Sequence, residues 1–99
     1  MHLADTPLSD DYRYEGFLDD FHRAVELWNR GDYGACAPLF EKLAAAGDAT
    51  AQYNLGVCYR DGLGVARSDA MKLALWTRAA EAGNIVAAYN VAVCHESGD

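Results

Sequence analysis

The sequence predicts an all-α protein, a stack of about five antiparallel helices without strands. Two observations favour this fold. Shifting the chain by 36 residues places GDATAQYNLGVCYRDG (47–62) on GNIVAAYNVAVCHESG (83–98), with seven identical pairs among sixteen positions. Within these segments, apolar residues recur at intervals of three and four, which is the period of an α-helix. A repeat of this length is typical of a solenoid of stacked helical units.

The first three helices are expected in the N-terminal two thirds of the chain. Residues 17–29 carry apolar side chains at helical spacing, and the GDY turn at 31–33 reverses the chain. The next helix is expected from about residue 34 to 46. It contains Pro38 near its first turn, where a missing amide costs little. A third helix covers 49–60, and glycine with an N-capping aspartate precedes it.

Two further helices complete the expected stack. The GLGV segment at 62–65 interrupts the helical pattern, and Ser68 or Asp69 can cap a helix that reaches about residue 82. The fifth helix, 85–96, follows a second glycine and the capping residue Asn84. The mid-helix Gly56 predicts a close approach of a neighbouring helix, because glycine otherwise weakens a helix by about 1 kcal/mol relative to alanine.

Composition and charge limit the partners. The 99 residues suit one domain, and the formal charge is −7. Residues 1–34 hold eight carboxylates against three arginines, so residues 1–13 are expected to be an acidic, flexible leader before a helical domain at 14–99. An acidic chain without a basic stripe repels phosphates and anionic lipid. Nucleic acid and membrane surfaces are therefore not expected partners.

The chain is expected in the cytoplasm. It has no apolar run of about twenty residues and no N-terminal segment with the pattern of a secretory signal. The cysteines, Cys36, Cys58 and Cys94, are odd in number and lack CxxC spacing, so they are predicted to be reduced thiols. Cys58 and Cys94 occupy equivalent repeat positions, which stacked helices hold too far apart for a disulfide.

No catalytic or metal-binding motif is found in the sequence. The histidines His2, His22 and His95 are scattered, without a second ligand at metal spacing. GLGV has too few glycines for a nucleotide loop and follows a helix. The sequence therefore predicts a non-enzyme with no cofactor and no metal.

The residues of one unit resemble the Sel1-like repeats, which are relatives of the tetratricopeptide repeats. The resemblance rests on one complete unit and extends over about residues 17–98. The departures are Asp69 and Leu73 early in the second helix, Val91 and Ala92 in place of a Leu-Gly pair, and His95 in place of tyrosine. The matching positions are Ala51, Leu55, Gly56, Tyr59, Gly62, Gly64, Val65, Ala79, Ala80 and Gly83.

This resemblance implies a right-handed α-α superhelix of about two and a half repeats, the last one incomplete, that binds a protein or peptide. It also implies that the first helix of each unit lines the concave side. The residues expected to contact a partner there are Phe21, His22, Val25, Tyr53, Asn54, Val57, Arg60, Tyr89, Asn90 and Val93. Two interpretations remain for the repeated Tyr-Asn pairs: contact with a ligand, or internal contacts of the repeat itself.

The last helix is apolar around much of its circumference, and it has no second helix to pair with in this sequence. It is expected to close the stack, to dock on another copy or another protein, or to continue into a longer array. The function predicted is a non-catalytic adaptor, scaffold or inhibitor, including an immunity-type bacterial protein. The alternative is a homo-oligomeric structural subunit, joined through this helix, with no ligand on the concave side.

Overall fold

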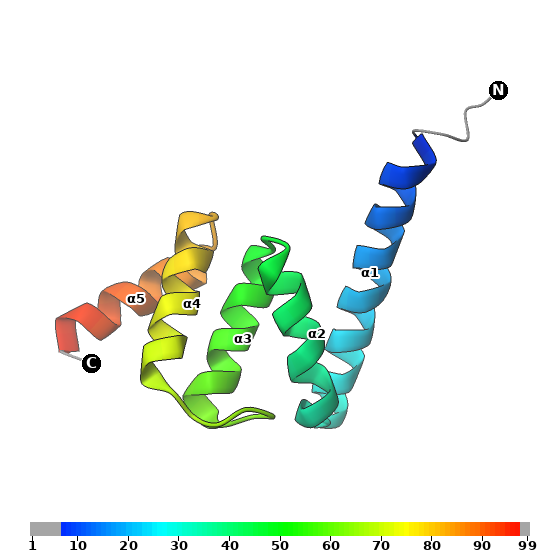
Figure 1. Ribbon diagram of the computed structural model, residues 1–99. Coiled ribbons are helices and arrows are strands. Elements are labelled where there is room, and N and C mark those ends of the chain that lie inside the picture. Colours follow the sequence, from blue (N-terminus) through cyan, green and yellow to red (C-terminus); the bar gives the residue numbers. More distant parts are fainter. Residues whose placement is uncertain (1–6, 98–99) are drawn as a thin grey trace.

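A computed structural model describes residues 7–97 of the chain, with side chains for residue 16 and residues 18–95. Within this range it contains five helices and no strand, so the all-α prediction is confirmed. Consecutive helices run in opposite directions (Figure 1). The helices are α1 (Pro7–Arg30), α2 (Tyr33–Ala45), α3 (Ala49–Asp61), α4 (Asp69–Glu81) and α5 (Ile85–Ser97).

Helix α1 begins at Pro7 instead of the predicted residue 17. Residues 7–13 of the predicted flexible leader are therefore helical, while residues 1–6 lie outside the described part. The local sequence accounts for the early start. Proline is favoured at the first helical position, and acidic residues are favoured in the first turns of a helix. An acidic segment that resembles a leader is here a helix start.

The starts of α3, α4 and α5 are capped by side chains, as the sequence predicts. Asp48 Oδ2 accepts a hydrogen bond from the Ala51 amide (2.8 Å), and Asn84 Oδ1 accepts one from the Ala87 amide (2.8 Å). Ser68, not Asp69, caps α4, because its Oγ accepts from the amide of Met71 at 3.1 Å. These bonds satisfy amides that the first helical turn leaves without a partner.

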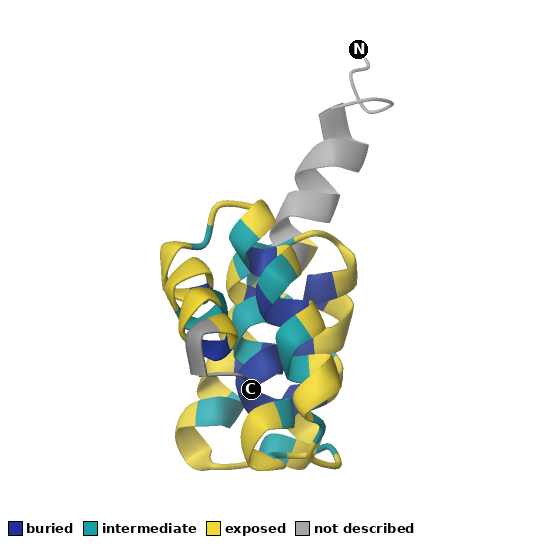
Figure 2. Cartoon of the chain, turned by 90° about the vertical axis from the view of Figure 1, so that its left-hand side faces the viewer, coloured by how far each residue is buried: buried dark blue, intermediate teal, exposed yellow. Residues whose placement is uncertain are grey.

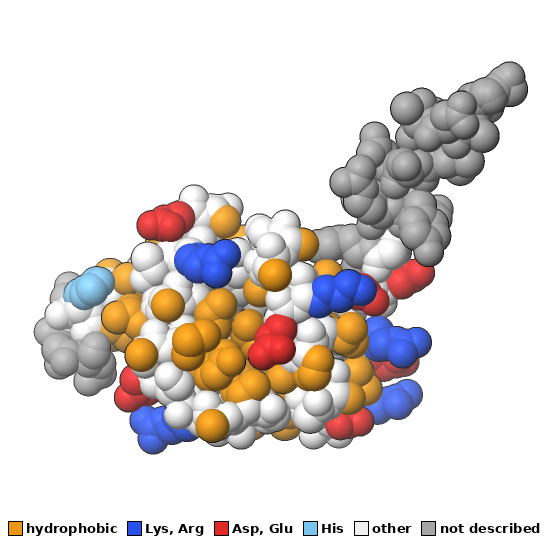
Figure 3. Space-filling view, viewed as in Figure 1, with side chains coloured by type: hydrophobic (Ala, Val, Ile, Leu, Met, Phe, Trp, Pro, Cys, Tyr) orange, Lys and Arg blue, Asp and Glu red, His pale blue; other side chains and the backbone are white. Residues whose placement is uncertain are grey.

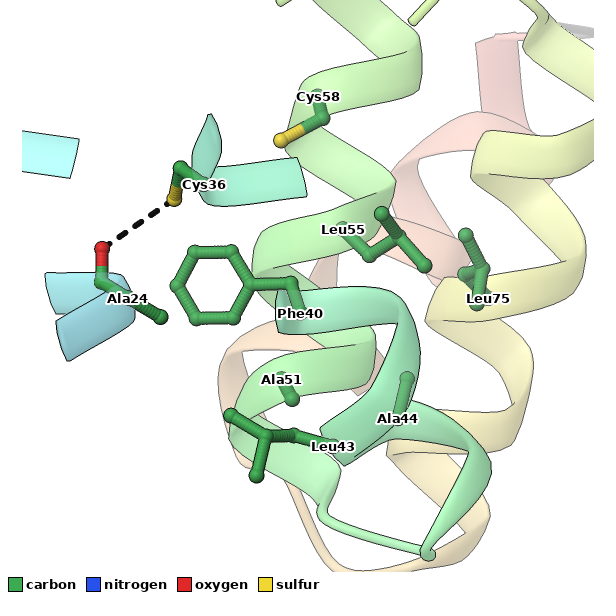
Figure 4. Packing of buried hydrophobic residues seen from close by; sticks show 9 residues of the cluster. All are labelled: Ala24, Cys36, Phe40, Leu43, Ala44, Ala51, Leu55, Cys58 and Leu75. Atoms are coloured by element: carbon green, nitrogen blue, oxygen red, sulfur yellow. Dashed lines mark hydrogen bonds between the residues drawn. The ribbon is translucent and has the colours of Figure 1, made fainter. Parts of the chain in front are cut away.

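Each helix packs on its sequence neighbours, so the molecule is an elongated stack of 59 × 28 × 17 Å. Buried residues follow the middle of the stack and exposed residues surround them (Figure 2). The first core cluster joins α1 to α4 (Figure 4): Ala24, Cys36, Phe40, Leu43, Ala44, Ala51, Leu55, Cys58 and Leu75. The second core cluster joins α3, α4 and α5: Val57, Trp76, Ala79, Ala87 and Cys94.

Two glycines permit close contacts. A Cβ on Gly56 would collide with Cδ1 and Nε1 of Trp76, which confirms the predicted close approach of a neighbouring helix. Gly64 lies in the loop between α3 and α4, where its φ of +74° favours glycine and a Cβ would collide with the carbonyl of Tyr33. The α3–α4 loop is thereby held against the start of α2.

Candidate partner-binding surface

The Trp76 cluster, formed by Tyr53, Arg60, Lys72 and Trp76, joins α3 to α4. The Tyr53 ring stacks on the indole with centroids 5.6 Å apart, and Trp76 Nε1 donates a hydrogen bond to the Tyr53 carbonyl at 3.1 Å. The Arg60 guanidinium lies 5.9 Å and the Lys72 ammonium 5.5 Å from the indole centre. Both distances suit cation–π attraction. Tyr53 and Arg60, both predicted to contact a partner, are thus already engaged within the chain.

The cations of the Trp76 cluster have carboxylates beside them. Arg60 donates two hydrogen bonds of 2.9 Å to Asp61, which raise the pKa of Arg60 and lower the pKa of Asp61. Lys72 lies 3.9 Å from Asp69. Because each cation has an acidic neighbour, the cluster is not a strongly charged site.

Asn90 links α5 to α3. Its Nδ2 donates to the hydroxyl of Tyr53 at 3.4 Å, across 37 residues of sequence. The structure therefore brings together Tyr53 and Asn90, two of the residues predicted from the repeat. Their polar groups lie at the boundary between the second core cluster and solvent, since both side chains are half-buried.

Helix α5 exposes large apolar side chains. The exposed fractions are 83% for Ile85, 55% for Val86, 69% for Tyr89 and 41% for Val93. With Ala92, which is also exposed, these residues occupy one side of the helix, and we call them the α5 apolar face. In the view of Figure 3, hydrophobic side chains cover the middle of the stack and continue to α5 at the left, while charged side chains lie mainly around the edge.

Ile85 and Val86 belong to this face but were not among the predicted contact residues. The repeat itself carries the signal that identifies them. A shift of 36 residues places Ile85 on Ala49 and Val86 on Thr50, so α5 has large apolar side chains where α3 has a small and a polar one. A departure from the repeat, not an identity, marks these positions.

Two residues predicted on α3 are less accessible than a contact surface requires. Val57 is only 9% exposed and belongs to the second core cluster with Trp76. Asn54 is half-buried. The side of α3 that carries Val57 is covered by α4, so Val57 stabilises the stack.

The predicted residues of α1 lie apart from those of α5. Phe21 packs against the first core cluster, whereas His22 and Val25 are exposed. His22 borders a hollow of about 490 Å³ together with Asp19, Asp20, Arg23, Glu26 and Leu39. Lys42 of α2 pairs with Asp20 at this edge (2.8 Å). Most of the side chains that line this hollow are charged, with more acidic than basic groups. They come from α1 and α2, and no residue of α5 lines it.

The three cysteines are buried, and none of them forms a disulfide. Burial, with Cys36 and Asp61 nearby, raises the pKa of the Cys58 thiol from 9.0 to about 11. Burial and Asp32 also raise the pKa of Cys36, whose Sγ donates to the Ala24 carbonyl at 3.2 Å (Figure 4). A buried thiol with a raised pKa is a poor nucleophile. Both side chains therefore serve the core.

The described residues contain no group of three or more His, Cys, Asp or Glu side chains placed to hold a metal ion. None of the helices found there has both the length and the apolar character needed to cross a bilayer.

The antiparallel helices, the 36-residue period and the neighbour-to-neighbour contacts define an α-solenoid repeat protein. The Sel1 repeat family model matches residues 49–84 and 85–99, more than half of the chain. The chain belongs to the Sel1 repeat family. Searches of curated proteins and of solved structures each gave no match. Sel1 repeats generally mediate protein–protein interaction, and the family is typically non-catalytic.

Proposed function

We propose that this protein is a non-catalytic protein-binding module whose contact surface is the α5 apolar face with the adjoining edge of α3. One observation carries the proposal: α5 exposes Ile85, Val86, Tyr89 and Val93 side by side. Scattered single apolar residues are normal on a protein surface, whereas adjacent large ones mark interaction sites. Aromatic side chains such as Tyr89 supply contact area at small entropic cost.

Polar groups beside this face support a directional contact. The amide of Asn90 holds a long hydrogen bond of 3.4 Å to Tyr53, and the Asn90 carbonyl oxygen is a further acceptor. Asn54 and Arg60 lie on the same helix as Tyr53 and extend the surface along α3. We include Phe21, His22 and Val25 of α1 as a second contact region on the concave side. An extended peptide bound at α5 would have to pass over α3 to contact it.

The role is that of an adaptor, a scaffold or an immunity-type inhibitor, which inhibits its partner by binding to it. A cytoplasmic location belongs to this proposal. It is supported by three cysteines that form no disulfide, since reducing compartments keep cysteines as thiols.

Partner capture with matched variants tests the proposal. The double variant Ile85→Ser/Tyr89→Ser changes two exposed side chains and should lose the native partner while the helical circular dichroism stays unchanged. Met71→Ser, which alters an exposed apolar side chain on α4, is the control and should retain the partner. Retention of the partner by the double variant would contradict the proposed surface.

Homo-oligomerisation through α5 is the second candidate function. It is favoured by the absence of Asp, Glu, Lys and Arg from residues 85–94, so two copies of this face would meet without direct charge repulsion. Sedimentation of the unchanged chain over a range of concentrations tests it. A dimer that dissociates in the Ile85→Ser/Tyr89→Ser variant would support this function, and a monomer at every concentration would exclude it.

A further inference from the structure

The hairpin formed by α3 and α4, residues 49–81, carries more positive than negative charge, unlike the rest of the chain. It holds four Lys or Arg residues and three carboxylates, whereas the other residues of the chain hold four and twelve. The acidic balance of the whole chain therefore does not describe this hairpin. An anion that the acidic N-terminal segment repels is attracted here.

Two of these cations lie at the same end of the hairpin. Arg60 is in the last turn of α3, and Lys72 is near the start of α4, which runs antiparallel to α3 (Figure 1). The Ser68 amide donates to the Tyr59 carbonyl at 2.9 Å, which holds the two helix ends together. The guanidinium and the ammonium lie 5.9 and 5.5 Å from the centre of the Trp76 indole. A small ligand beside this ring would therefore lie near both cations.

The ammonium of Lys72 has too few acceptors for its burial. The side chain is only 12% exposed, yet its ion-pair partner Asp69 lies 3.9 Å away, beyond hydrogen-bond length. Among the described residues, the ammonium has no hydrogen-bond acceptor. Burial of a charged group without hydrogen bonds raises the free energy of the folded state. A ligand that supplies an acceptor would lower this free energy.

The guanidinium of Arg60 is held in place and keeps unused donors. Its Nε and Nη2 each donate to the Asp61 carboxylate at 2.9 Å, which fixes the plane of the group. The N–H groups of Nη1 have no acceptor within the part of the chain that the structure describes. The side chain is 45% exposed, so a ligand can reach it from solvent.

The local charges favour one kind of anion. At this end of the hairpin Arg60, Arg67 and Lys72 lie with Asp61 and Asp69, which leaves one positive charge in excess. A singly charged anion balances this excess, whereas the two aspartates repel a dianion such as phosphate. A carboxylate has one oxygen for each of two donors, and bonds between charged groups are the strong ones.

We propose that Arg60 and Lys72 together bind a carboxylate of the partner protein, beside the Trp76 indole. One carboxylate oxygen accepts from Nη1 of Arg60, and the other accepts from Nζ of Lys72. This inference rests on the proposed function as a protein-binding module. It adds the chemical group that the partner presents to the α3 edge of the surface, which is an acidic side chain or the carboxyl end of a chain.

Short peptides serve as probes of this site. The first is a capped tripeptide with glutamate between two alanines, the second carries glutamine in place of the glutamate, and the third is trialanine with a blocked amino end and a free carboxyl end. Each peptide, and inorganic phosphate separately, is titrated to about 30 mM into the isotope-labelled full chain, since so few contacts support only millimolar binding.

The indole N–H signals in NMR spectra report binding. Both carboxylate peptides are expected to shift the Trp76 signal and the amides of residues 59–73 in a saturable way, while the glutamine peptide and phosphate leave them nearly unchanged. Trp28 is the internal control, because its ring packs against Tyr33 and Phe40 and not against this hairpin end. Of the two carboxylate peptides, the tighter one identifies an acidic side chain or a chain end as the source.

Matched variants separate a direct contact from general attraction. Lys72→Met removes the ammonium but keeps an apolar stem, and it should weaken binding of the carboxylate peptides about tenfold. Arg67→Gln is the control, since it removes one positive charge from the same end of the hairpin, and it should change the affinity by less than about threefold. Lys72→Arg restores the charge and should recover most of the binding.

Several results would overturn the inference. These are the absence of a Trp76 shift with either carboxylate peptide, an equal shift with the glutamine peptide or with phosphate, and an equal loss of affinity in Arg67→Gln and Lys72→Met. If the probes fail while Ile85→Ser/Tyr89→Ser still loses the native partner, the protein-binding function stands and only the carboxylate contact is rejected.

Discussion

The side chain of Trp76 contacts two neighbouring helices and several kinds of group. Its indole stacks on Tyr53, donates to the Tyr53 carbonyl and fills the notch at Gly56. It also belongs to the second core cluster with residues of α5. A buried indole needs a partner for its N–H, and the carbonyl of Tyr53 provides one inside the α3 helix. The α3–α4 interface is therefore specified by shape and by one directed hydrogen bond.

Replacing Gly56 with alanine tests this fit. The added Cβ would collide with Trp76, so Gly56→Ala is expected to lower the free energy of unfolding by about 1–3 kcal/mol, although alanine is the better helix former. Gly16→Ala is the control, since nothing lies within 4 Å of a Cβ there, and it should raise stability by up to about 1 kcal/mol. Urea denaturation measures both. Equal effects of the two variants would contradict the close fit.

The thiol of Cys58 gives the stability of the protein a dependence on pH. Burial raises its pKa from 9.0 to about 11, so the folded state keeps the thiol neutral where the unfolded chain ionises it. Its contribution to stability is complete below about pH 9 and is lost as the pH rises toward 11. Between these values the free energy of unfolding should fall by about 2 kcal/mol less in Cys58→Ala than in the unchanged chain. Parallel denaturant titrations measure the difference, and identical pH profiles would contradict it.

At the residue scale, the sequence predicted contacts that a mid-helix glycine or the internal repeat indicates. The close approach at Gly56 follows from a glycine in a helix. The hydrogen bond between Tyr53 and Asn90 agrees with one of the two interpretations left open for the Tyr-Asn pairs, internal contacts of the repeat. The burial of Val57 was not predicted, because the helical period alone does not say how much of α3 is covered by α4. Ile85 and Val86 were not among the predicted contact residues, because their counterparts on α3 are the small Ala49 and the polar Thr50.

At the scale of the elements, the helix starts depend on short side chains that bind backbone amides. Asp48 caps α3 in the middle of the stack, and Asn84 caps α5 at its end. The bonds are equally short, but α3 packs on both α2 and α4, whereas α5 packs mainly on α4 and reaches α3 at its edge, where Asn90 binds Tyr53. Loss of the same cap should therefore have different consequences.

Asn84→Ala is expected to cost about 1 kcal/mol and to speed amide hydrogen exchange mainly within α5. Asp48→Ala should cost a similar amount but speed exchange across the stack, because α3 opens only when its neighbours do. Exchange measured by mass spectrometry of peptic fragments separates the two patterns. Asn84→Asp keeps the acceptor and should resemble the unchanged chain. Uniform acceleration in Asn84→Ala would show that α5 is not a separate unit.

The helix boundaries show which helix starts can be predicted from the local sequence. Glycines with positive φ followed by Asp48 or Asn84 fixed the predicted starts of α3 and α5, and these starts are confirmed. The start of α1 was placed ten residues too late because residues 7–16 have few apolar side chains. The helix-start signals in that segment are Pro7 and the following aspartates, and the acidic composition obscured them.

At the scale of the whole molecule, each helix of the stack is stabilised by its contacts with the neighbouring helices. The interior helix α3 is covered on two sides, while α5 is covered on one and exposes its apolar face. In solenoids, the free energy of unfolding is approximately the sum of the intrinsic stabilities of the repeats and the energies of the interfaces between neighbouring repeats. The fold was predictable because each interface repeats a local pattern. The contact surface was predictable only in part, since it depends on which interface is left uncovered.

This arrangement predicts a gradient of local stability that a partner would change. Amides of α2 and α3 should require nearly global unfolding to exchange, while amides of α5 should exchange through a local opening at lower free energy. Exchange at several low urea concentrations measures these openings separately. Because a bound partner gives α5 the second interface that α3 already has, binding should raise the opening free energy of α5 toward that of α3 and leave α2 unchanged. Equal opening free energies of α3 and α5 in the free protein would mean that the apolar face costs α5 no stability, and the physical reason for a partner there would be lost.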